Sequence, residues 1–426
     1  MGTMSERREP GIPASSERGP SGPAPQVPGA EDMSERLILI SADCHAGPRP
    51  ERARGYVEPA FRDAFDAWLA DTDGRARRQA AHTGQAIYGD EALDDFNALE
   101  AVAEGGMDGA WDSPRRLAEL EADGIAAEVI YPGGGGPSIS PFDVGLMTYQ
   151  YEQDPAIWAA GCRAYNRWLG DFCNEAPGRR AGVALVTLDD VDATVREIDG
   201  LRDRGVFGGI LLPSGTGANP LYNHPRYEPV WAACAANSLP VHTHSGWTPN
   251  YGDFPGSLGI FVTEITWYAH RAFWHLAWSG ALERHSALRL VMTEQGATWI
   301  IDTLADMDRT YEMPMFRHLR RQLPLSPSEY FARQCAISSF IGPEEAAARD
   351  NIGVRNLMWG ADYPHIEGTW PHTEAKLKEG FADVPQAEVV AMVGGNALDV
   401  FGFDRDLLGE LARAIGPPGD LLGVPG

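Results

Sequence analysis

Lysine is nearly absent from this 426-residue chain. Only Lys376 and Lys378 occur, against 33 arginines, so guanidinium groups carry almost all of the positive charge. Chemistry that depends on a lysine amine is therefore confined to one short segment. Elsewhere in the chain, any reactive site must use other side chains.

Paired cysteines and long hydrophobic runs are missing as well. The five cysteines are scattered and form no C-x-x-C motif, which is typical of a reduced protein rather than a disulfide scaffold or a thiolate zinc site. The longest apolar runs have only a few residues, as in 37–40 (LILI), so no helix is expected to span a membrane. The first residues carry charge but no apolar core of a secretory signal. We therefore expect a cytoplasmic protein.

Basic residues are too few to balance the acidic ones. The chain has 35 lysines and arginines against 60 aspartates and glutamates, a formal net charge of −25. A surface that follows a phosphate backbone needs clustered positive charge. We expect neither a nucleic-acid partner nor a membrane partner.

The apolar content is sufficient for a large core. Hydrophobic residues make up 43% of the chain, which excludes disorder throughout its length. Residues 1–35 differ, because they are rich in Pro, Gly and Ser and show no periodicity. We predict a disordered tail over 1–35 and a single domain over 36–426.

Short apolar runs alternate with longer amphipathic segments from residue 37 onward. Each run is continuous and ends at a polar or turn residue, the pattern of a strand buried on both faces. Eight such strands joined by helices favour parallel pairing and closure into an α/β fold of the (β/α)8 TIM-barrel type. An open doubly wound sheet is the alternative, but no G-x-G-x-x-G motif follows the first strand. The expected strands are 37–45, 126–132, 181–188, 208–214, 240–246, 289–295, 334–341 and 357–363, and the expected helices include 114–123, 156–174, 190–204, 225–237, 265–284, 297–312 and 344–351.

Two connections are longer than usual. Residues 46–112 follow the first strand, and residues 246–288 follow the fifth. Both would leave the carboxyl ends of strands, where barrel enzymes build their active sites. We expect these insertions to lie near a functional site.

Carboxylates and imidazoles gather at the predicted carboxyl ends of the strands. The alternation of side chains along a strand places Asp43 and His45 on one face of the first strand. Such groups are costly to bury without partners. The side chains concerned are Asp43, His45, His242, His244, Glu294, Asp362 and His365.

One divalent cation would compensate these groups. The predicted ligands are Asp43, His45, His244 and Asp362. This mixed nitrogen and oxygen set suits zinc, with manganese or iron as other candidates. His242 is either a further ligand or a residue that orients one through a hydrogen bond.

The ordered motifs resemble a known family. The stretches ISADCHAGP (40–48), LPVHTHSG (239–246), LRLVMTEQGATWI (288–300) and LMWGADYPH (357–365) resemble the amidohydrolase-related metal-dependent hydrolases, in the branch that includes aminocarboxymuconate-semialdehyde decarboxylase. The resemblance covers most of 37–403. It implies a distorted eight-stranded barrel with a metal at its carboxyl-terminal mouth. It also implies that His45 and His244 bind the metal and that Asp362 both binds it and carries a proton.

Three positions distinguish this chain within that resemblance. Asp43 stands where the family often has the first His of His-x-His, and Glu294 stands where it often has a His before Gly. Strand four, 208–214, lacks the lysine that two-metal branches carboxylate, which implies a single-metal site. Decarboxylating members generally rely on the strand-six histidine, so Glu294 favours another reaction.

Hydrolysis of an amide or related C–N bond is the reaction we expect first. The metal would lower the pKa of a bound water and polarise the scissile carbonyl. Asp362 would accept the proton of that water, with Glu294 or His365 as a second proton carrier. The substrate would be a small or peptide-like organic molecule.

Two alternatives stay open. The first is metal-dependent decarboxylation of an aromatic or unsaturated acid, in which Asp362 protonates carbon and Arg163 or Arg167 holds a second carboxylate. The second is a metal-binding scaffold without activity, which does not explain ligands on three strands. A homodimer is also expected, because barrels of this type commonly dimerise.

Overall fold

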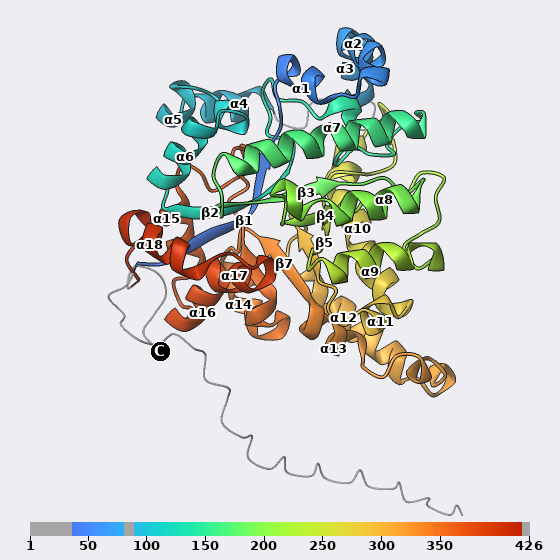
Figure 1. Cartoon of the computed structure of the whole chain (residues 1–426). Coiled ribbons are helices and arrows are strands. Elements are labelled where there is room, and N and C mark those ends of the chain that lie inside the picture. The colour runs from blue at the N-terminus through green and yellow to red at the C-terminus, as the bar shows by residue number, and fades with distance from the viewer. Residues whose placement is uncertain (1–35, 81–88, 420–426) are drawn as a thin grey trace, which may run out of the picture. The chain divides into compact units, whose positions relative to one another are not determined.

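The computed structural model describes residues 36–80 and 89–419 (Figure 1). The tail predicted over 1–35 lies outside the described residues, as do the last residues of the chain. In the described ranges, no helix combines the length and apolar character needed to cross a bilayer.

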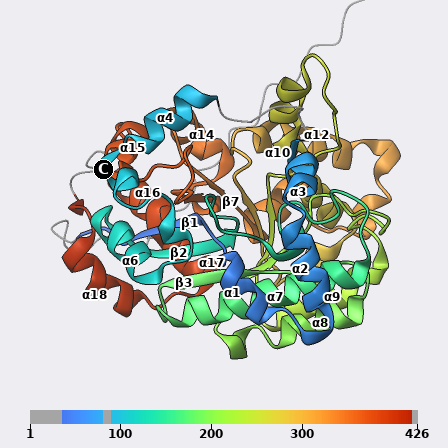
Figure 2. The same cartoon turned by 90° about the horizontal axis from the view of Figure 1, so that it is seen from above.

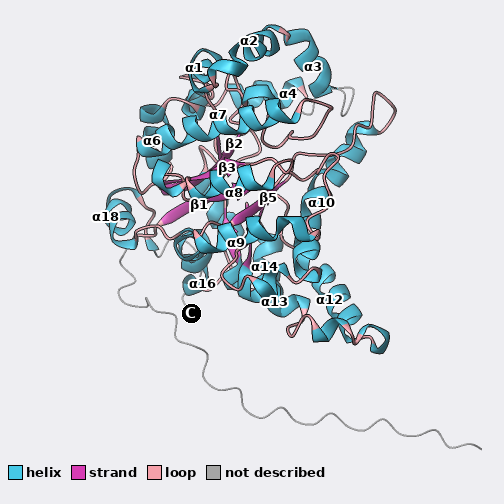
Figure 3. Cartoon of the chain, turned by 45° about the vertical axis from the view of Figure 1, so that its right-hand side comes forward, coloured by secondary structure: helices cyan, strands magenta, loops and turns pink. Residues whose placement is uncertain are grey.

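Eight parallel strands follow one another in chain order around a nearly closed barrel. A bridge between Cys44 and Tyr363 brings β1 against the segment after β8, where the His45 N–H donates to the Tyr363 carbonyl over 2.7 Å. Figure 3 shows the strands at the centre with helices around them. The predicted (β/α)8 barrel is confirmed. Its strands are β1 (Leu39–Ala46), β2 (Ile125–Pro132), β3 (Arg180–Leu185), β4 (Gly209–Leu211), β5 (Val241–His244), β6 (Leu290–Thr293), β7 (Cys335–Ser339) and β8 (Leu357–Trp359).

Helices separate consecutive strands, as the amphipathic segments predict. Aspartate side chains accept backbone N–H groups at the first turns of α6, α7, α8 and α18, which stabilises those helix starts. The α-helices are α1 (Pro50–Tyr56), α2 (Arg62–Ala70), α3 (Thr72–Ala80), α4 (Asp90–Asn97), α5 (Glu100–Ala103), α6 (Ser113–Ala122), α7 (Pro155–Asn174), α8 (Val191–Asp199), α9 (Glu228–Ala236), α10 (Ser257–Trp278), α11 (Ala281–Arg284), α12 (Trp299–Glu312), α13 (Pro327–Gln334), α14 (Pro343–Ile352), α15 (Thr373–Gly380), α16 (Gln386–Val390), α17 (Asn396–Phe401) and α18 (Arg405–Ile415).

Both long connections carry helices of their own. Helices α1 to α5 lie between β1 and α6, and α1 and α2 pack beside α7 through a small apolar cluster that includes Val57, Phe65 and Trp68 (Figures 1 and 2). Helices α10 and α11 lie between β5 and β6. Helix α10 begins at Ser257, earlier than the expected residue 265. Gly256 adopts the left-handed conformation and begins the first turn of the helix. The next residues have only modest helix propensity, so the sequence alone did not indicate this start.

The last elements close the amino-terminal end of the barrel. The π-helix η9 (Ala391–Gly395) and α17 pack on β1 and β8. Gly394 approaches the Ile38 carbonyl so closely that a Cβ would overlap it. The Phe401 ring stacks on His242, with ring centroids 5.8 Å apart. The described residues thus pack side chains against this end of the barrel, opposite the carboxyl ends of the strands.

A buried ionic network joins the first three strands. Arg116 on α6 pairs with Glu128 on β2 at 2.6 Å, and Arg180 on β3 approaches the same carboxylate at 3.3 Å. Arg116 also donates to the His45 carbonyl over 2.9 Å and to the Gly109 carbonyl over 3.0 Å. This network therefore fixes the backbone of β1 at the point where it carries His45.

Candidate metal centre

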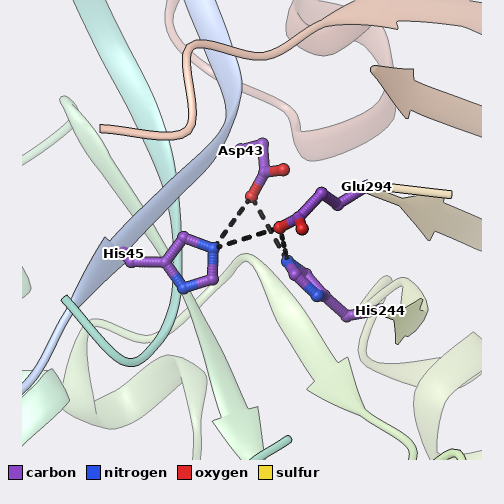
Figure 4. Close-up of side chains that lie close together, drawn as sticks. All are labelled: Asp43, His45, His244 and Glu294. Atoms are coloured by element: carbon purple, nitrogen blue, oxygen red, sulfur yellow. Dashed lines mark ion pairs between the residues drawn. The ribbon is translucent and has the colours of Figure 1, made fainter. Parts of the chain in front are cut away.

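The strands deliver the predicted polar side chains to one place. Asp43 and His45 lie on β1 and His244 ends β5. Glu294 directly follows β6, and Asp362 lies three residues after the end of β8. Figure 4 shows that Asp43, His45, His244 and Glu294 point toward a common centre. The barrel thus converts positions far apart in the sequence into one cluster.

The distances within the cluster match those between ligands of one ion. His45 Nε2 lies 3.5 Å from Asp43 Oδ1, 3.2 Å from Asp362 Oδ1 and 3.8 Å from Glu294 Oε2. His244 Nε2 lies 3.5 Å from Asp43 Oδ1 and 3.3 Å from Glu294 Oε2. Ligands about 2.1 Å from a zinc ion in tetrahedral geometry are about 3.4 Å from each other.

Backbone carbonyls fix the orientation of both histidines. His45 Nδ1 lies 2.8 Å from the Pro132 carbonyl, and His244 Nδ1 lies 2.8 Å from the Ser245 carbonyl. A carbonyl oxygen only accepts hydrogen bonds, so Nδ1–H is the donor and Nε2 is the nitrogen that faces the centre. Both imidazoles are therefore prepared to bind a metal through Nε2.

Several buried atoms of the cluster lack a hydrogen bond within the described residues: Asp43 Oδ1, His45 Nε2, His244 Nε2 and both carboxylate oxygens of Asp362. Orphaned polar atoms that face one another in a protein interior are costly unless a charge compensates them. A divalent cation fits this donor set, and two overlapping groups of four side chains could hold one. These are Asp43, His45, His244 and Glu294, and His45, Glu294, Asp362 and His365.

The ionisation of the cluster reflects burial and mutual contact. Burial opposes the charge of Asp43, but His244 and His45 outweigh it and hold the pKa of this carboxyl below its ordinary value. Burial likewise opposes protonation of His45, yet Asp362 and Asp43 raise its pKa. Burial raises the pKa of Glu294. Its side chain is 25% exposed, more than those of the other two carboxylates, Asp43 and Asp362. Each charged group of the cluster is therefore stabilised against the cost of burial by the opposite charge of its neighbours.

Backbone strain marks two of the carboxylates. Asp362 and Glu294 have φ values of 55° and 52°, in the left-handed region that non-glycine residues seldom occupy. The Asp362 N–H donates to the Asp43 carbonyl over 2.7 Å, and the Glu294 N–H donates to the Ser338 carbonyl over 3.1 Å. Neighbouring strands thus hold both residues in conformations that turn their side chains toward the centre.

His365 connects the cluster to solvent. Its Nδ1 lies 2.9 Å from Asp362 Oδ1, and its side chain is 22% exposed, whereas Asp362 is fully buried. The His365 ring also stacks on His45, with centroids 4.1 Å apart. A proton can therefore pass between solvent and Asp362 through His365.

His242 faces the barrel interior beneath the cluster. Its Nε2 lies 2.8 Å from the Gly208 carbonyl and its Nδ1 lies 2.6 Å from the Tyr131 hydroxyl, which also contacts Thr293. Both ring nitrogens are occupied, so no lone pair is directed at the centre. These contacts favour the interpretation of His242 as a supporting residue rather than a ligand.

Sequence reasoning missed the support of Glu294 from α10. His270 Nε2 lies 3.2 Å from the carbonyl of Gln295, the neighbour of Glu294, and the His270 ring stacks on Trp299 at 3.6 Å. Gln295 donates through Nε2 to Thr243 on β5 over 2.8 Å. No local pattern in the sequence signals these contacts between distant elements.

The structure does not place Arg163 and Arg167 at the cluster. Both lie on α7, where their guanidinium groups pair with Glu58, and Arg167 also donates to the Tyr56 carbonyl. These contacts hold the segment between β1 and α6, which contains Glu58, against α7. The expectation that one of them holds a substrate carboxylate at the centre is therefore not supported.

A cavity of about 500 Å³ lies at the end of β2, where the Pro132 carbonyl accepts a hydrogen bond from His45. Pro132 and Gly133 line it, and a Cβ on Gly133 would lie 3.1 Å from His45 Nδ1, so glycine lets this wall pack closely against the His45 ring. Its other walls combine apolar side chains with two arginines of α3 that sequence reasoning missed. They include Ile139, Val144, Leu146, Met147, Tyr151, Arg75 and Arg78.

Comparisons with known proteins agree with this geometry. A family model described as "Amidohydrolase" matches residues 42–403. Gamma-resorcylate decarboxylase of Rhodococcus jostii (strain RHA1) is 31% identical over 282 residues, which cover 60% of this chain and 79% of that protein.

Solved structures share the fold at lower identity. A 5-carboxyvanillate decarboxylase of Sphingomonas paucimobilis is 21% identical, with a TM-score of 0.59, and the match covers 86% of this chain and all of that one. A dihydroxybenzoic acid decarboxylase of Polaromonas sp. JS666, solved with manganese and the inhibitor 2-nitroresorcinol, is 16% identical, with a TM-score of 0.57 and coverage of 87% and 98%.

These findings correct the expected reaction. The expectation of a hydrolase was wrong, because the relatives are decarboxylases of aromatic acids. It rested on Glu294 in place of a histidine, but Glu294 still contacts both metal-facing imidazoles, so the residue type at this position does not identify the reaction. Zinc is not confirmed either, since the Polaromonas structure contains manganese.

Proposed function

The chain belongs to the amidohydrolase family, in the branch that includes aminocarboxymuconate-semialdehyde decarboxylase, and we propose that it is a metal-dependent non-oxidative decarboxylase of an aromatic carboxylic acid. The observation that carries the proposal is the convergence of buried ligand atoms that form no hydrogen bond within the described residues, near a cavity at the end of β2. The aromatic acids named for the relatives support the substrate class.

We assign Asp43, His45, His244 and Asp362 as ligands of one divalent ion. Asp43, His45 and His244 belong to the first group of four side chains named above, and Asp362 joins them through His45, whose Nε2 lies 3.2 Å from Asp362 Oδ1. The high share of carboxylate oxygen suits manganese, and the imidazoles also suit zinc. The Polaromonas decarboxylase was solved with manganese, and we propose manganese for this chain as well. When bound, the ion would hold the substrate carboxylate and neutralise charge that develops during the reaction.

The proton for the reaction comes through Asp362 and His365. Their contact of 2.9 Å and the partial exposure of His365 support a route from solvent to the buried carboxyl. The proton is added to the ring carbon that bears the carboxylate. The bond between this ring carbon and the carboxylate carbon then breaks, its electron pair returns to the ring, and carbon dioxide leaves. Glu294, on the more exposed side of the centre, is proposed as an additional proton carrier.

The cavity beside the centre suits an aromatic anion. Its apolar walls can contact a ring, and Arg75 supplies positive charge in a chain of net charge −25. Arg78 also lines the cavity, but its guanidinium pairs with Asp71 and with Asp143, a carboxylate of the same wall. The Arg75 guanidinium stacks on Trp68 at 4.5 Å, which holds it in place without neutralising it. A small aromatic acid therefore matches both the shape and the charge of this space.

The test is metal-dependent release of carbon dioxide. Protein stripped with a chelator and reloaded with manganese or zinc is incubated with a panel of hydroxybenzoates, and carbon dioxide is measured. We expect release only from the loaded protein. His365→Asn should lower the rate by about 100-fold with metal content unchanged, because a positioned proton donor is lost.

His372→Asn is the matched control, because His372 is an exposed histidine at the start of α15. Its rate should equal that of the unmodified protein. If the loaded protein leaves every aromatic acid of the panel intact with either metal, the proposed function is wrong.

We also propose a cytoplasmic location. Its support is that all five cysteines are free and buried in the structure, as expected for a protein kept in a reducing compartment.

A further inference from the structure

A second cavity lies between the loop after β4 and helix α10. It has a volume of about 160 Å³ and is lined by residues 214–217, by Thr243 of β5 and by one face of α10. His242 and His244 flank Thr243 on β5 and point to the barrel interior, so alternation places this cavity on the outer side of the strand. The β5 backbone therefore separates it from the metal centre.

Hydrogen-bond donors of this cavity have no partners. Trp247 Nε1 and His275 Nδ1 are buried, and neither forms a hydrogen bond within the described residues. A buried donor without an acceptor costs about 1–3 kcal/mol. The indole N–H can only donate, so an acceptor supplied by a ligand would recover that cost.

A cation stands beside these donors. Arg271 of α10 lines the cavity, and the rings of Trp267 and Tyr268 lie 5.6 and 5.8 Å from its guanidinium carbon. No ion pair or hydrogen bond joins Arg271 to another residue in the described part of the chain. The aromatic rings supply no carboxylate or carbonyl oxygen to these N–H groups, so Arg271 can donate to an anionic ligand.

The electrostatics of the cavity differ from those of the chain as a whole. No aspartate or glutamate lines it, although the chain carries a net charge of −25. Burial, together with Arg271, lowers the pKa of His275 to about 4, so this histidine is neutral near pH 7 and its Nδ1 can donate. An anion is the ligand that this arrangement favours.

The walls and the size indicate the rest of the ligand. Tyr222, Trp247 and Tyr268 present aromatic surface to the cavity. An apolar cavity of roughly 150 Å³ is large enough to bind benzene. A wider groove of about 660 Å³ shares Leu221 and His275 with the cavity and provides a route from solvent.

We propose that this cavity binds a small aromatic carboxylate at a site separate from the metal centre. The ring packs between the aromatic walls, and the carboxylate accepts from Arg271 and from Trp247 Nε1. This inference does not rest on the proposed decarboxylase activity, because none of the lining residues belongs to the metal centre.

Two measurements with defined probes test the proposal. Crystals of the manganese-loaded protein are soaked in 4-bromobenzoate, and the bromine is located by its anomalous signal. Calorimetric titration with benzoate is carried out on the unmodified protein, on Arg271→Gln, on Trp247→Phe and on Arg309→Gln. Arg309 is an exposed arginine paired with Asp306 and serves as the matched control.

We expect a bromine peak in the cavity and a benzoate affinity that falls at least tenfold in Arg271→Gln and severalfold in Trp247→Phe. Arg309→Gln should bind as the unmodified protein does, and Arg271→Gln, Trp247→Phe and Arg309→Gln should have the metal content of the unmodified protein. His244→Ala should still show the cavity peak, because the metal centre is not required. A bromine peak only at the metal centre, no peak at all, or a crystal peak without Arg271-dependent binding in solution would each overturn the proposal, the last meaning binding at crystal concentration only.

Discussion

Two histidines of β5 differ in chemistry because their hydrogen-bond partners differ. His244 uses Nδ1 on a carbonyl and directs Nε2 at the metal centre, whereas both nitrogens of His242 are already engaged. Burial lowers the pKa of His242 to about 3, so it is neutral over the whole physiological range. His242 therefore supports the barrel interior, and His244 is available to an ion.

His242→Gln tests this distinction. We expect metal content to stay at the level of the unmodified protein, while the free energy of unfolding falls by about 1–3 kcal/mol because Tyr131 and the Gly208 carbonyl lose a partner. Elemental analysis and urea unfolding measure the two effects. A variant that loses its metal without loss of stability would show that His242 is a ligand.

At this scale the sequence predicted which residues would meet, but not how each one acts. Strand alternation and burial cost were sufficient to select Asp43, His45, His244 and Asp362. The function of His242 depends on Tyr131 and Gly208, which belong to other strands. Arg75 was missed for a similar reason: nothing in its own segment shows that α3 lies over the cavity.

Within the barrel wall, β1 depends on α6 for its position. Arg116 is fully buried, pairs with Glu128 and holds the His45 carbonyl. Removing one partner of a buried pair leaves an uncompensated charge. Arg116→Met should therefore lower the free energy of unfolding by about 3–5 kcal/mol, as measured by urea unfolding.

The exposed pair of Arg309 and Asp306 on α12 supplies the control. Arg309→Met is expected to change the unfolding free energy by less than about 0.5 kcal/mol. A cost below about 1 kcal/mol for Arg116→Met would show that β1 does not need this contact.

Asp123, at the end of α6, accepts the N–H of Thr373 at the start of α15 over 3.2 Å. Burial raises its pKa to about 6 despite this bond. The native state therefore favours the protonated carboxyl, and stability from this group is present below pH 4 and is lost as the pH rises through 6.

Asp123→Asn removes this ionisation and keeps an acceptor oxygen. We expect the variant to be more stable than the unmodified protein at pH 7.5 by about 1–2 kcal/mol, allowing for partial solvent exposure, with the difference narrowing as the pH falls toward 4. Urea unfolding across this range measures it. A difference independent of pH would contradict the interpretation.

The whole fold was predictable because its signal repeats. Eight apolar runs, each closed by a polar residue, indicated a barrel even though individual boundaries differ by a few residues. The interior of the insertions was not predictable in the same way. The pairing of α1 and α2 with α7 depends on contacts such as those of Glu58 with Arg163, which no periodic pattern expresses.

A homodimer remains a prediction at this scale. Four large apolar side chains are exposed in the loop before α10 and along its first turns: Phe254, Ile260, Val262 and Trp267. Exposed apolar groups of this kind are typical of contact surfaces. Light scattering should give a mass of about twice the 46.2 kDa of one chain, and a mass equal to one chain would contradict the prediction.

Metal content tests the central claim most directly. Elemental analysis compares the unmodified protein with His244→Ala and Asp362→Ala, using His242→Gln as a control that leaves the proposed ligands intact. The account predicts one equivalent of manganese or zinc in the unmodified protein and in the control, and loss of the metal in both ligand variants. Absence of bound metal from the unmodified protein after incubation with either ion, or full retention in both ligand variants, would contradict it.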